Sequence, residues 1–374
     1  MSRINDLIAE YCPNGVEYRE LAELVDYQQP SPYIVSSTNY DDSFSLPVLT
    51  AGQSFILGYS DDDQGIFYAS AERPVIIFDD FTTSFHWVDF DFKVKSSAIK
   101  MLRIKPDVDC SFRYVYYAMS CIQYVPKEHS RQWISIYSTF KIPVPPLPVQ
   151  EEIVRILDSF SSLEAELEAE LEARRKQYTH YRDELLTFDR ERVLVITVGE
   201  LCDINRGRIM SKGYLEKHRG AYPVYSSQTA NNGRFGFINS YDYDGEYITW
   251  TTDGANAGSV FYHDEKFSIT NVCGLLRIKD SRVRAKYLKY VLDVTAKQYV
   301  NTGMGNPKLM SNVMKQIKVG IPSLAEQDMI ISILDRFDKL TNDLSSGLPA
   351  EIEARRKQYE YYRDRLLSFD ELAA

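Results

Sequence analysis

Few residues of this chain have the types and spacing that catalysis requires. Gly303-Met304-Gly305 lacks the third glycine and the strand–helix surroundings of a dinucleotide-binding turn. A phosphate-binding Gly-Lys-Ser/Thr run is absent, since Gly213 follows Lys212 rather than preceding it. The sequence therefore predicts no nucleotide cofactor site.

Acidic residues, histidines and cysteines give little further indication of a metal site or a catalytic centre. Asp61-Asp62-Asp63 and Asp79-Asp80 could bind a cation, but a solvated turn is the favoured interpretation. His86 and His263 lie near aspartates, with no nucleophile to complete a triad. The five cysteines are widely spaced and form no Cys-x-x-Cys, which predicts reduced, mostly buried thiols and no zinc site.

Polar loops form the other group of candidates. Glutamine and asparagine can form paired hydrogen bonds with adenine, and arginine can do so with guanine. The same loops contain residues that build turns, so for any single residue a turn or a phosphate contact is favoured over a base contact. Trp133 is equally consistent with a core residue and a stacking platform. The candidate DNA-contacting residues are Thr50, Gln53, Thr82, Thr83, Lys127, Arg131, Gln132, Ser226, Gln228, Thr229, Asn231, Asn232, Arg234, Thr252, Asn256, Asn306 and Lys308.

The net charge of −10 by itself argues against a nucleic-acid partner, but the charge is unevenly distributed. Residues 1–145 hold 12 Lys/Arg and 19 Asp/Glu, whereas residues 190–320 hold 19 and 12. The second part is therefore basic. The first part needs a local basic patch, or the help of a partner, to hold DNA.

The elements that position these loops occur twice. Glu172–Tyr178 is repeated as Glu353–Tyr359, 181 residues later. Upstream, the Pro-x-Leu-x-x-Gln pattern that begins at Pro145 recurs at Pro322, 177 residues later. A repeat of half the chain is a duplicated module rather than a solenoid unit. Such a protein suits two partner subunits or two DNA half-sites.

Both copies predict long helices. Apolar residues recur every three or four positions from Ile153 to Phe188 and from Ile330 to Phe369, which indicates one apolar seam on each helix. The two helices therefore pair antiparallel in our prediction. Residues 150–188 would form a helix of about 58 Å, a spacer for two domains. Gly347-Leu348-Pro349 should break the second helix.

Weaker matches extend the repeat into the globular parts, where short strand-like runs such as 74–78 and 247–250 predict an α/β (α+β) fold. We expect globular domains at 1–145 and 190–320, a central helix at 146–189 and a C-terminal helix at 321–374, with pseudo-two-fold symmetry. The composition is globular, no apolar run approaches membrane-spanning length, and no signal peptide is evident, so we expect a cytoplasmic protein.

The chain resembles the specificity (S) subunits of type I restriction–modification systems over essentially its full length. The resemblance rests on Ala-Arg-Arg-Lys-Gln-Tyr followed by Tyr-Arg-Asp, Leu-Leu and Phe at 173–188 and 354–369, on the two Pro-x-Leu-x-x-Gln entries, and on the opening segment Cys12–Tyr18. One departure is that only the second helix carries a break, at 347–349.

The resemblance implies that each globular part is a target recognition domain that reads one half of a split double-stranded DNA sequence. The helices would space the domains and dock two methyltransferase subunits, with restriction (motor) subunits joining through the complex. This chain would be the non-catalytic reader. S-adenosylmethionine, ATP and Mg would bind only to partners, and Asn306-Pro307-Lys308 indeed lacks the Asn-Pro-Pro-aromatic pattern of an adenine methyltransferase. Tandem Leu-Glu-Ala-Glu units at 163–170 resemble the family's spacer repeats, whose number sets the distance between half-sites.

Two questions stay open. The basic triplets of the helix repeat suggest partner docking or helix–helix salt bridges rather than DNA contacts. The candidate docking residues are Arg174, Arg175, Lys176, Tyr178, Arg355, Arg356, Lys357 and Tyr359. The alternative function is an assembly adaptor whose helices hold other proteins together without reading bases. An adaptor does not explain why the shared framework persists while the loops between its parts diverge.

Overall fold

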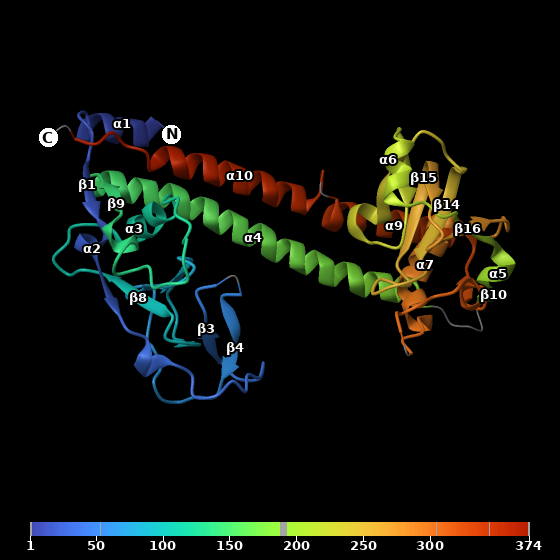
Figure 1. Ribbon diagram of the computed structural model, residues 1–374, viewed down its shortest axis with the longest axis horizontal. Coiled ribbons are helices and arrows are strands. Elements are labelled where there is room, and N and C mark those ends of the chain that lie inside the picture. Colours follow the sequence, from blue (N-terminus) through green and yellow to red (C-terminus); the bar gives the residue numbers. More distant parts are fainter. Residues whose placement is uncertain (1, 53, 188–192, 304, 344, 373–374) are drawn as a thin grey trace. The chain divides into compact units, whose positions relative to one another are not determined.

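The computed structural model describes residues 2–52, 54–187, 193–303, 305–343 and 345–372. The chain divides into two compact units (Figure 1). Unit 1 comprises Met1–Leu167 and Ile352–Ala374, and unit 2 comprises Glu168–Glu351. Each unit therefore combines one predicted globular domain with parts of the predicted helices.

Unit 1 has a mixed set of helices and strands. Its elements are α1 (Ser2–Tyr11), β1 (Glu17–Glu20), α2 (Leu21–Leu24), β2 (Val25–Gln28), η1 (Ser31–Tyr33), β3 (Leu46–Leu49), β4 (Ile56–Ser60), β5 (Val75–Asp79), β6 (Phe85–Val88), β7 (Lys93–Val94), β8 (Ile99–Ile104), α3 (Phe112–Met119), η2 (Tyr137–Thr139) and β9 (Lys141–Val144). The long helix α4 (Leu147–Leu185) begins in unit 1, and α10 (Leu348–Leu366) ends there.

Unit 2 also has a mixed set of helices and strands. These are β10 (Leu194–Thr197), α5 (Val198–Leu201), β11 (Cys202–Arg206), α6 (Lys212–Lys217), β12 (Tyr222–Tyr225), η3 (Ala230–Gly233), β13 (Arg234–Ile238), β14 (Tyr243–Thr251), β15 (Val260–Ile269), β16 (Cys273–Ile278), α7 (Ala285–Thr295), η4 (Ala296–Tyr299), α8 (Ser311–Met314), β17 (Lys318–Ile321) and α9 (Leu324–Asn342).

Strand pairing shows that both units have one topology. The sheet β2-β8-β5-β6 of unit 1 corresponds to β11-β16-β14-β15 of unit 2, and the pair β1-β9 corresponds to β10-β17. In unit 1 a separate sheet, β4-β3-β7, contains a parallel pair between β3 and β7. In unit 2 the single long strand β15 makes the pairings that β6 and β7 make in unit 1, because it pairs antiparallel with β14 and parallel with β12. The predicted α/β fold with two equivalent globular parts is confirmed.

The weak sequence matches mark shared packing positions. Leu24 and Leu201, matched in sequence, are both fully buried. The paired lysines make the same contact in each unit: Lys105 Nζ donates to the Ala22 carbonyl at 2.6 Å, and Lys279 Nζ donates to Gly199 at 3.1 Å. The matched residues therefore hold a common framework.

The Pro-x-Leu-x-x-Gln entry has a structural role in both units. Gln150 is completely buried at the start of α4, where its amide donates to the Pro145 carbonyl at 2.7 Å and accepts from the Ser111 N–H at 2.8 Å. Gln327 repeats this in α9, donating to Pro322 at 2.9 Å and accepting from the Arg284 N–H at 2.8 Å. Ser111 and Arg284 are the N-cap residues of α3 and α7. Each glutamine thus ties its long helix to the helix of the globular domain.

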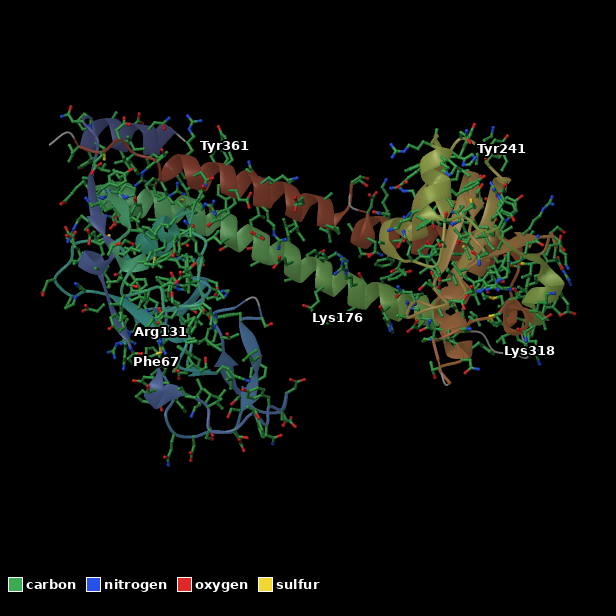
Figure 2. All side chains as sticks on the ribbon, in the orientation of Figure 1. Phe67, Arg131, Lys176, Tyr241, Lys318 and Tyr361 are labelled. Carbon is green, nitrogen blue, oxygen red and sulfur yellow. The ribbon has the colours of Figure 1, made fainter. Side chains whose placement is uncertain are left out.

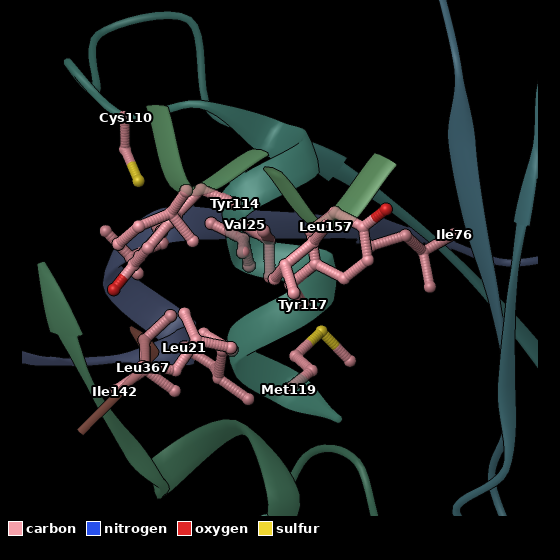
Figure 3. Close-up of a cluster of buried hydrophobic side chains, with 14 of the residues drawn as sticks. Leu21, Val25, Ile76, Cys110, Tyr114, Tyr117, Met119, Ile142, Leu157 and Leu367 are labelled. Carbon is pink, nitrogen blue, oxygen red and sulfur yellow. The ribbon is translucent and has the colours of Figure 1, made fainter. Parts of the chain in front are cut away.

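An aspartate two turns further along reinforces this junction. Asp158 accepts from Arg113 Nε at 2.8 Å and from the Tyr117 hydroxyl. In unit 2, Asp335 accepts from Lys286 at 2.8 Å and from the Tyr290 hydroxyl at 2.6 Å. Figure 3 shows the unit 1 core beside this junction, where side chains of α3, the neighbouring strands and α4 gather.

The helices pair antiparallel within unit 1, as predicted. Phe160 of α4 stacks on Tyr362 of α10 with ring centroids 5.5 Å apart, and Glu164, one turn later, accepts from Arg356, which precedes Tyr362. Within unit 2 the distal part of α4 packs on α9, where Tyr178 and Tyr181 contact Phe337. Of the predicted seam, Phe188 and Leu344 lie outside the described residues.

The predicted break of the second helix is also confirmed, since α9 ends at Asn342 and α10 begins at Leu348. Gly347 is buried so close to the end of α9 that a Cβ would lie 2.5 Å from the Lys339 carbonyl oxygen and 2.7 Å from that of Leu340. No other residue fits there without moving the backbone, which explains why a glycine stands at the break.

The glutamine junction predicts a large loss of stability in Gln327→Leu. The substitution replaces the amide with an apolar side chain of similar size and leaves the Arg284 N–H and the Pro322 and Arg282 carbonyls without their buried partner. We expect a cost of about 2–4 kcal/mol, measured by urea unfolding. Gln298→Leu is the matched control, because Gln298 is exposed. Equal unfolding free energies for the two variants would contradict this role of the amide.

Candidate nucleic-acid interface

The three candidate loops of unit 1 lie together at one edge of its sheets. They follow β3 (residues 50–55, without 53), follow β5 (80–84) and precede η2 (127–136). The Ser84 hydroxyl donates to the Ala51 carbonyl at 2.6 Å, which joins the first two loops. Asp80 joins the second loop to the third. We call these three segments the loop surface of unit 1.

Asp80 is the centre of this surface. Its buried carboxylate accepts from the Trp133 N–H at 2.8 Å and the Gln132 N–H at 3.1 Å. It also forms ion pairs with Lys100, at 3.5 Å, and with Arg131, at 3.2 Å. Lys100 is buried, whereas the Arg131 side chain is 49% exposed. A basic side chain is therefore held at the edge of an otherwise acidic unit.

Gln132 requires a correction. The sequence predicts a DNA contact, but the residue is 1% exposed. Its amide donates to Ser130 and its carbonyl oxygen accepts from the Tyr124 hydroxyl at 2.7 Å. With its hydrogen bonds made inside the protein, Gln132 shapes the loop instead. Trp133 likewise belongs to the core, with 2% exposure.

The remaining unit 1 candidates differ in accessibility. Thr82 and Lys127 are exposed, and Thr50 is half-buried. Thr83 is buried in the left-handed region (φ 60°) and donates to the Thr82 carbonyl, so its predicted DNA contact is also corrected to a role in the turn. Gln53 lies outside the described residues.

Unit 2 brings its three candidate loops together in the same way. They follow β12 (226–234), follow β14 (252–259) and precede α8 (301–310, without 304). The Ser227 hydroxyl donates to the Asp253 carbonyl at 2.5 Å, and the Gly254 N–H donates to the Pro307 carbonyl at 3.0 Å. We call these segments the loop surface of unit 2.

One backbone hydrogen bond shows that the two loop surfaces are equivalent. In unit 1 the Gln132 N–H donates to the Asp80 carbonyl at 2.8 Å. In unit 2 the Leu309 N–H donates to the Thr252 carbonyl at 2.9 Å. Both bonds join the loop after the central strand to the loop before the final strand. The same edge of the same fold is therefore covered by different side chains.

The loop after β12 presents several amides outward. Asn231, Asn232 and Gly233 all adopt left-handed backbone conformations, with φ of 51°, 56° and 82°. Asparagine tolerates this conformation better than most residues, so the run forms a tight turn with both asparagine side chains exposed. Thr229 and Arg234 are exposed beside it.

The other candidates of unit 2 divide into exposed and internal side chains. Asn256, Asn306 and Lys308 are exposed. Ser226 shares a hydrogen bond with Thr270, and the amide of Gln228 donates to the Arg234 carbonyl, so both support the loop. Thr252 is fully buried and donates to the Val272 carbonyl at 2.8 Å, which replaces its predicted DNA contact with a structural role.

Sequence reasoning missed Arg206, the last residue of β11. Its guanidinium lies 3.5 Å from the Asp253 carboxylate, at the loop surface. Its position in a strand and not in a polar loop hid it, because only strand pairing shows that β11 ends at this edge.

The candidate docking residues are partly used within the chain. Tyr178 packs on Phe337 and Tyr359 on Phe160, and burial raises the pKa of each tyrosine to about 12. Arg174 pairs with Glu170, and Arg356 pairs with Glu164 of the facing helix. Of these two arginines, only Arg356 therefore forms the predicted salt bridge between helices, because Arg174 and Glu170 both belong to α4.

The other members of the basic triplets have different surroundings. The Arg355 guanidinium donates to Gln358 at 3.1 Å, and Arg175 is exposed. The Lys176 and Lys357 side chains are 77% and 72% exposed, each with an ion pair to a glutamate one turn earlier. Figure 2 shows Lys176 projecting from α4. Both lysines thus remain accessible to another protein.

Buried titratable groups lie in the sheet of unit 2. His263 in β15 shares a hydrogen bond with the Thr249 hydroxyl at 2.9 Å and stacks on Tyr225. Burial lowers its pKa to about 4, so the ring is neutral at physiological pH. Burial also raises the pKa of the Cys202 and Cys273 thiols to about 12, which keeps them protonated.

Within the described residues, no group of three or more His, Cys, Asp or Glu side chains is arranged to hold a metal ion. The described helices include none with the length and apolar character needed to cross a bilayer.

Comparison with known proteins decides the family. The model of the type I restriction modification DNA specificity domain matches twice, at residues 13–173 and 191–354. The chain belongs to this family of specificity subunits. It is 39% identical to the EcoR124I/EcoR124II specificity subunit of Escherichia coli, over 95% of this chain and 94% of the relative. A putative type I specificity subunit of Mycoplasma pneumoniae is 42% identical over 62% of this chain and 95% of its own length.

Solved structures agree on the fold. The S subunit of a type I restriction–modification system from M. genitalium matches with a TM-score of 0.65 at 15% identity, covering 94% of this chain and 96% of that chain. A chain from a study of type I complex assembly and conformational transition matches with a TM-score of 0.53 at 14% identity, covering 95% and 98%. The specificity-subunit fold is therefore shared at low sequence identity.

The neutral His263 predicts that acid destabilises this specificity subunit. Because the folded-state pKa is lowered, the unfolded chain binds more protons between pH 6.5 and 4, and stability present above pH 6.5 is lost as the pH falls toward 4. Between pH 7 and 4.5 we expect this residue to contribute a loss of about 2–3 kcal/mol. Urea unfolding at both pH values should show a smaller loss in His263→Gln than in the wild type.

His180→Gln is the matched control for this experiment. His180 is 74% exposed, so its removal should leave the loss of stability unchanged. If the His263 and His180 variants lose equal stability on acidification, burial of His263 is not the cause.

Proposed function

We propose that each unit of this specificity subunit reads one half of a bipartite double-stranded DNA target through its loop surface. The proposal rests on the sheet edge that carries the three loops, because this edge occurs once in each unit. Both units place three loops at the same end of the same sheet framework, joined by an equivalent backbone hydrogen bond, yet with different side chains. A common scaffold with divergent polar loops is the arrangement expected of two readers for two different sequences.

The accessible side chains suit both kinds of DNA contact. Exposed asparagines at 231, 232, 256 and 306 offer the paired donor and acceptor that adenine requires. Arg131, Arg234 and Lys127 offer positive charge for phosphates or guanine. Unit 2 carries most of the positive charge, so it supplies more of the sequence-independent attraction than unit 1.

The chain acts in this proposal as a non-catalytic, cytoplasmic reader. Two methyltransferase subunits dock on the helices, where the exposed Lys176 and Lys357 occupy equivalent positions of the repeat. Restriction subunits join through the complex. We expect S-adenosylmethionine, ATP and Mg to bind to those partners, because the sequence of this chain has neither a Gly-Lys-Ser/Thr run nor an Asn-Pro-Pro-aromatic pattern.

Genome-wide mapping of methylated adenines tests this function. Cells that express this chain with its candidate methyltransferase are compared with cells that express the methyltransferase alone. We expect a split sequence motif that is methylated only when the chain is present. If the complex assembles but no chain-dependent motif appears, the chain is an assembly adaptor and not a reader.

The central helix predicts how the two half-sites are spaced. Residues 163–170 of α4 form a continuous helix of tandem Leu-Glu-Ala-Glu units, and four residues add about 6 Å of helix. Deleting Leu167–Glu170 should therefore shorten the gap in the methylated motif by about one to two base pairs while leaving both half-site sequences unchanged.

The control for the deletion replaces Leu167, Glu168 and Glu170 with alanine, which preserves the length of the helix. This variant should retain the wild-type gap. A deletion variant that methylates the wild-type motif with its original gap would refute the spacer role of these residues.

A further inference from the structure

Asp253 lies within the loop surface of unit 2 and contacts basic side chains from two different segments. One carboxylate oxygen lies 3.5 Å from the Arg206 guanidinium, and the other lies 3.9 Å from Lys308 Nζ. All three side chains reach solvent, with exposures of 29% for Asp253, 34% for Arg206 and 53% for Lys308. A single acid thus holds two cations at the edge that we propose faces DNA.

We propose that Asp253 is a specificity-determining residue, which orients Arg206 toward a guanine in the half-site of unit 2 and keeps Arg206 and Lys308 from binding phosphates of any sequence. This inference rests on the DNA-reading function proposed above. Phosphates are the same in every sequence, so an unrestrained cation strengthens binding to all DNA alike. A restrained guanidinium presents its planar donors in one direction, as recognition of guanine O6 and N7 requires.

The backbone at Arg206 is held in place on both sides of the residue. Its backbone is paired with Gly274 in the sheet. The following residue, Gly207, approaches the β15 end so closely that a Cβ would lie 2.0 Å from the Ile269 carbonyl oxygen. The backbone on both sides of the Arg206 side chain is therefore fixed, and the ion pair with Asp253 at 3.5 Å is the contact that can orient its guanidinium.

Asp253 is itself held from two sides. The Ser227 hydroxyl donates to its backbone carbonyl at 2.5 Å, and its carboxylate lies 2.6 Å from the Thr252 hydroxyl oxygen, whose single proton is shared with the Val272 carbonyl. An asparagine at this position keeps the shape and can still accept from Thr252. Asp253→Asn therefore removes the negative charge while preserving the support of the loop.

A related arrangement, with different partner positions, occurs in unit 1. Asp80 lies at the equivalent edge and forms ion pairs with Arg131 and Lys100. Asp80 is 1% exposed and also accepts from two backbone N–H groups, so its substitution would disturb folding. Asp253, which is partly exposed, allows the electrostatic role to be tested separately.

The test uses the full chain assembled with its methyltransferase subunits. Affinity is measured for a duplex that carries the mapped motif and for one in which only the half-site of unit 2 is scrambled. In Asp253→Asn we expect weaker binding to the motif and stronger binding to the scrambled duplex, so that their ratio falls about tenfold. Methylation in cells should relax at a G·C pair in one half of the motif, and the other half serves as an internal control.

Two further variants separate this role from other effects. Asp244→Asn removes the same charge from the opposite end of β14, where Asp244 pairs with Lys266, and should leave the ratio unchanged. In an Arg206→Gln background, Asp253→Asn should no longer weaken binding to the motif, because the side chain that it orients is gone.

Three results would overturn the inference. An unchanged ratio in Asp253→Asn would show that the carboxylate does not set specificity. Equal weakening on both duplexes would show a structural role only. Relaxation at an A·T pair would contradict the assignment of Arg206 to guanine. By contrast, a wild-type complex that does not discriminate between the duplexes would overturn the proposed DNA-reading function itself.

Discussion

Each unit depends on one buried amide at the start of a long helix. Gln150 and Gln327 each satisfy a carbonyl at the end of a strand and the N-cap N–H of a domain helix. The amide side chain provides a donor and an acceptor at once, on two atoms in a fixed geometry. Because the helix, the strand and the domain helix meet at this side chain, the orientation of the globular domain on its helix follows from it.

The loops at the other edge of each domain take no part in that junction, so their side chains are free to vary. The framework positions Leu24 and Leu201 are buried, whereas the loops run over the surface, where side chains change at little cost in stability. Asp80 and Asp253 show how far the loops can differ on one scaffold. Both form ion pairs with basic side chains at the edge, but Asp80 is buried among its loops, whereas Asp253 is partly exposed to solvent.

Much of the architecture could be predicted because it depends on local patterns. The apolar spacing of α4, the break before α10 at Gly347 and the duplicated framework all appear in the sequence as periods or repeats. The candidate loops were found by their polar composition, and the structure brings them to one edge in each unit. Gln132 and Thr252 could not be placed in this way, since their burial depends on loops that are distant in sequence.

The sequence by itself determined that the chain is a duplicated module of two globular parts and long amphipathic helices, because periodicity and repetition are properties of the order of residues. Only the tertiary structure decided which polar side chains face solvent. Thr252 is buried because its hydroxyl bonds to the Val272 carbonyl, which is distant in sequence. Arg206 lies at the loop surface beside Asp253 because the pairing of β11 with β16 ends there. A polar residue is available for recognition only where the fold does not satisfy its hydrogen bonds or charge internally.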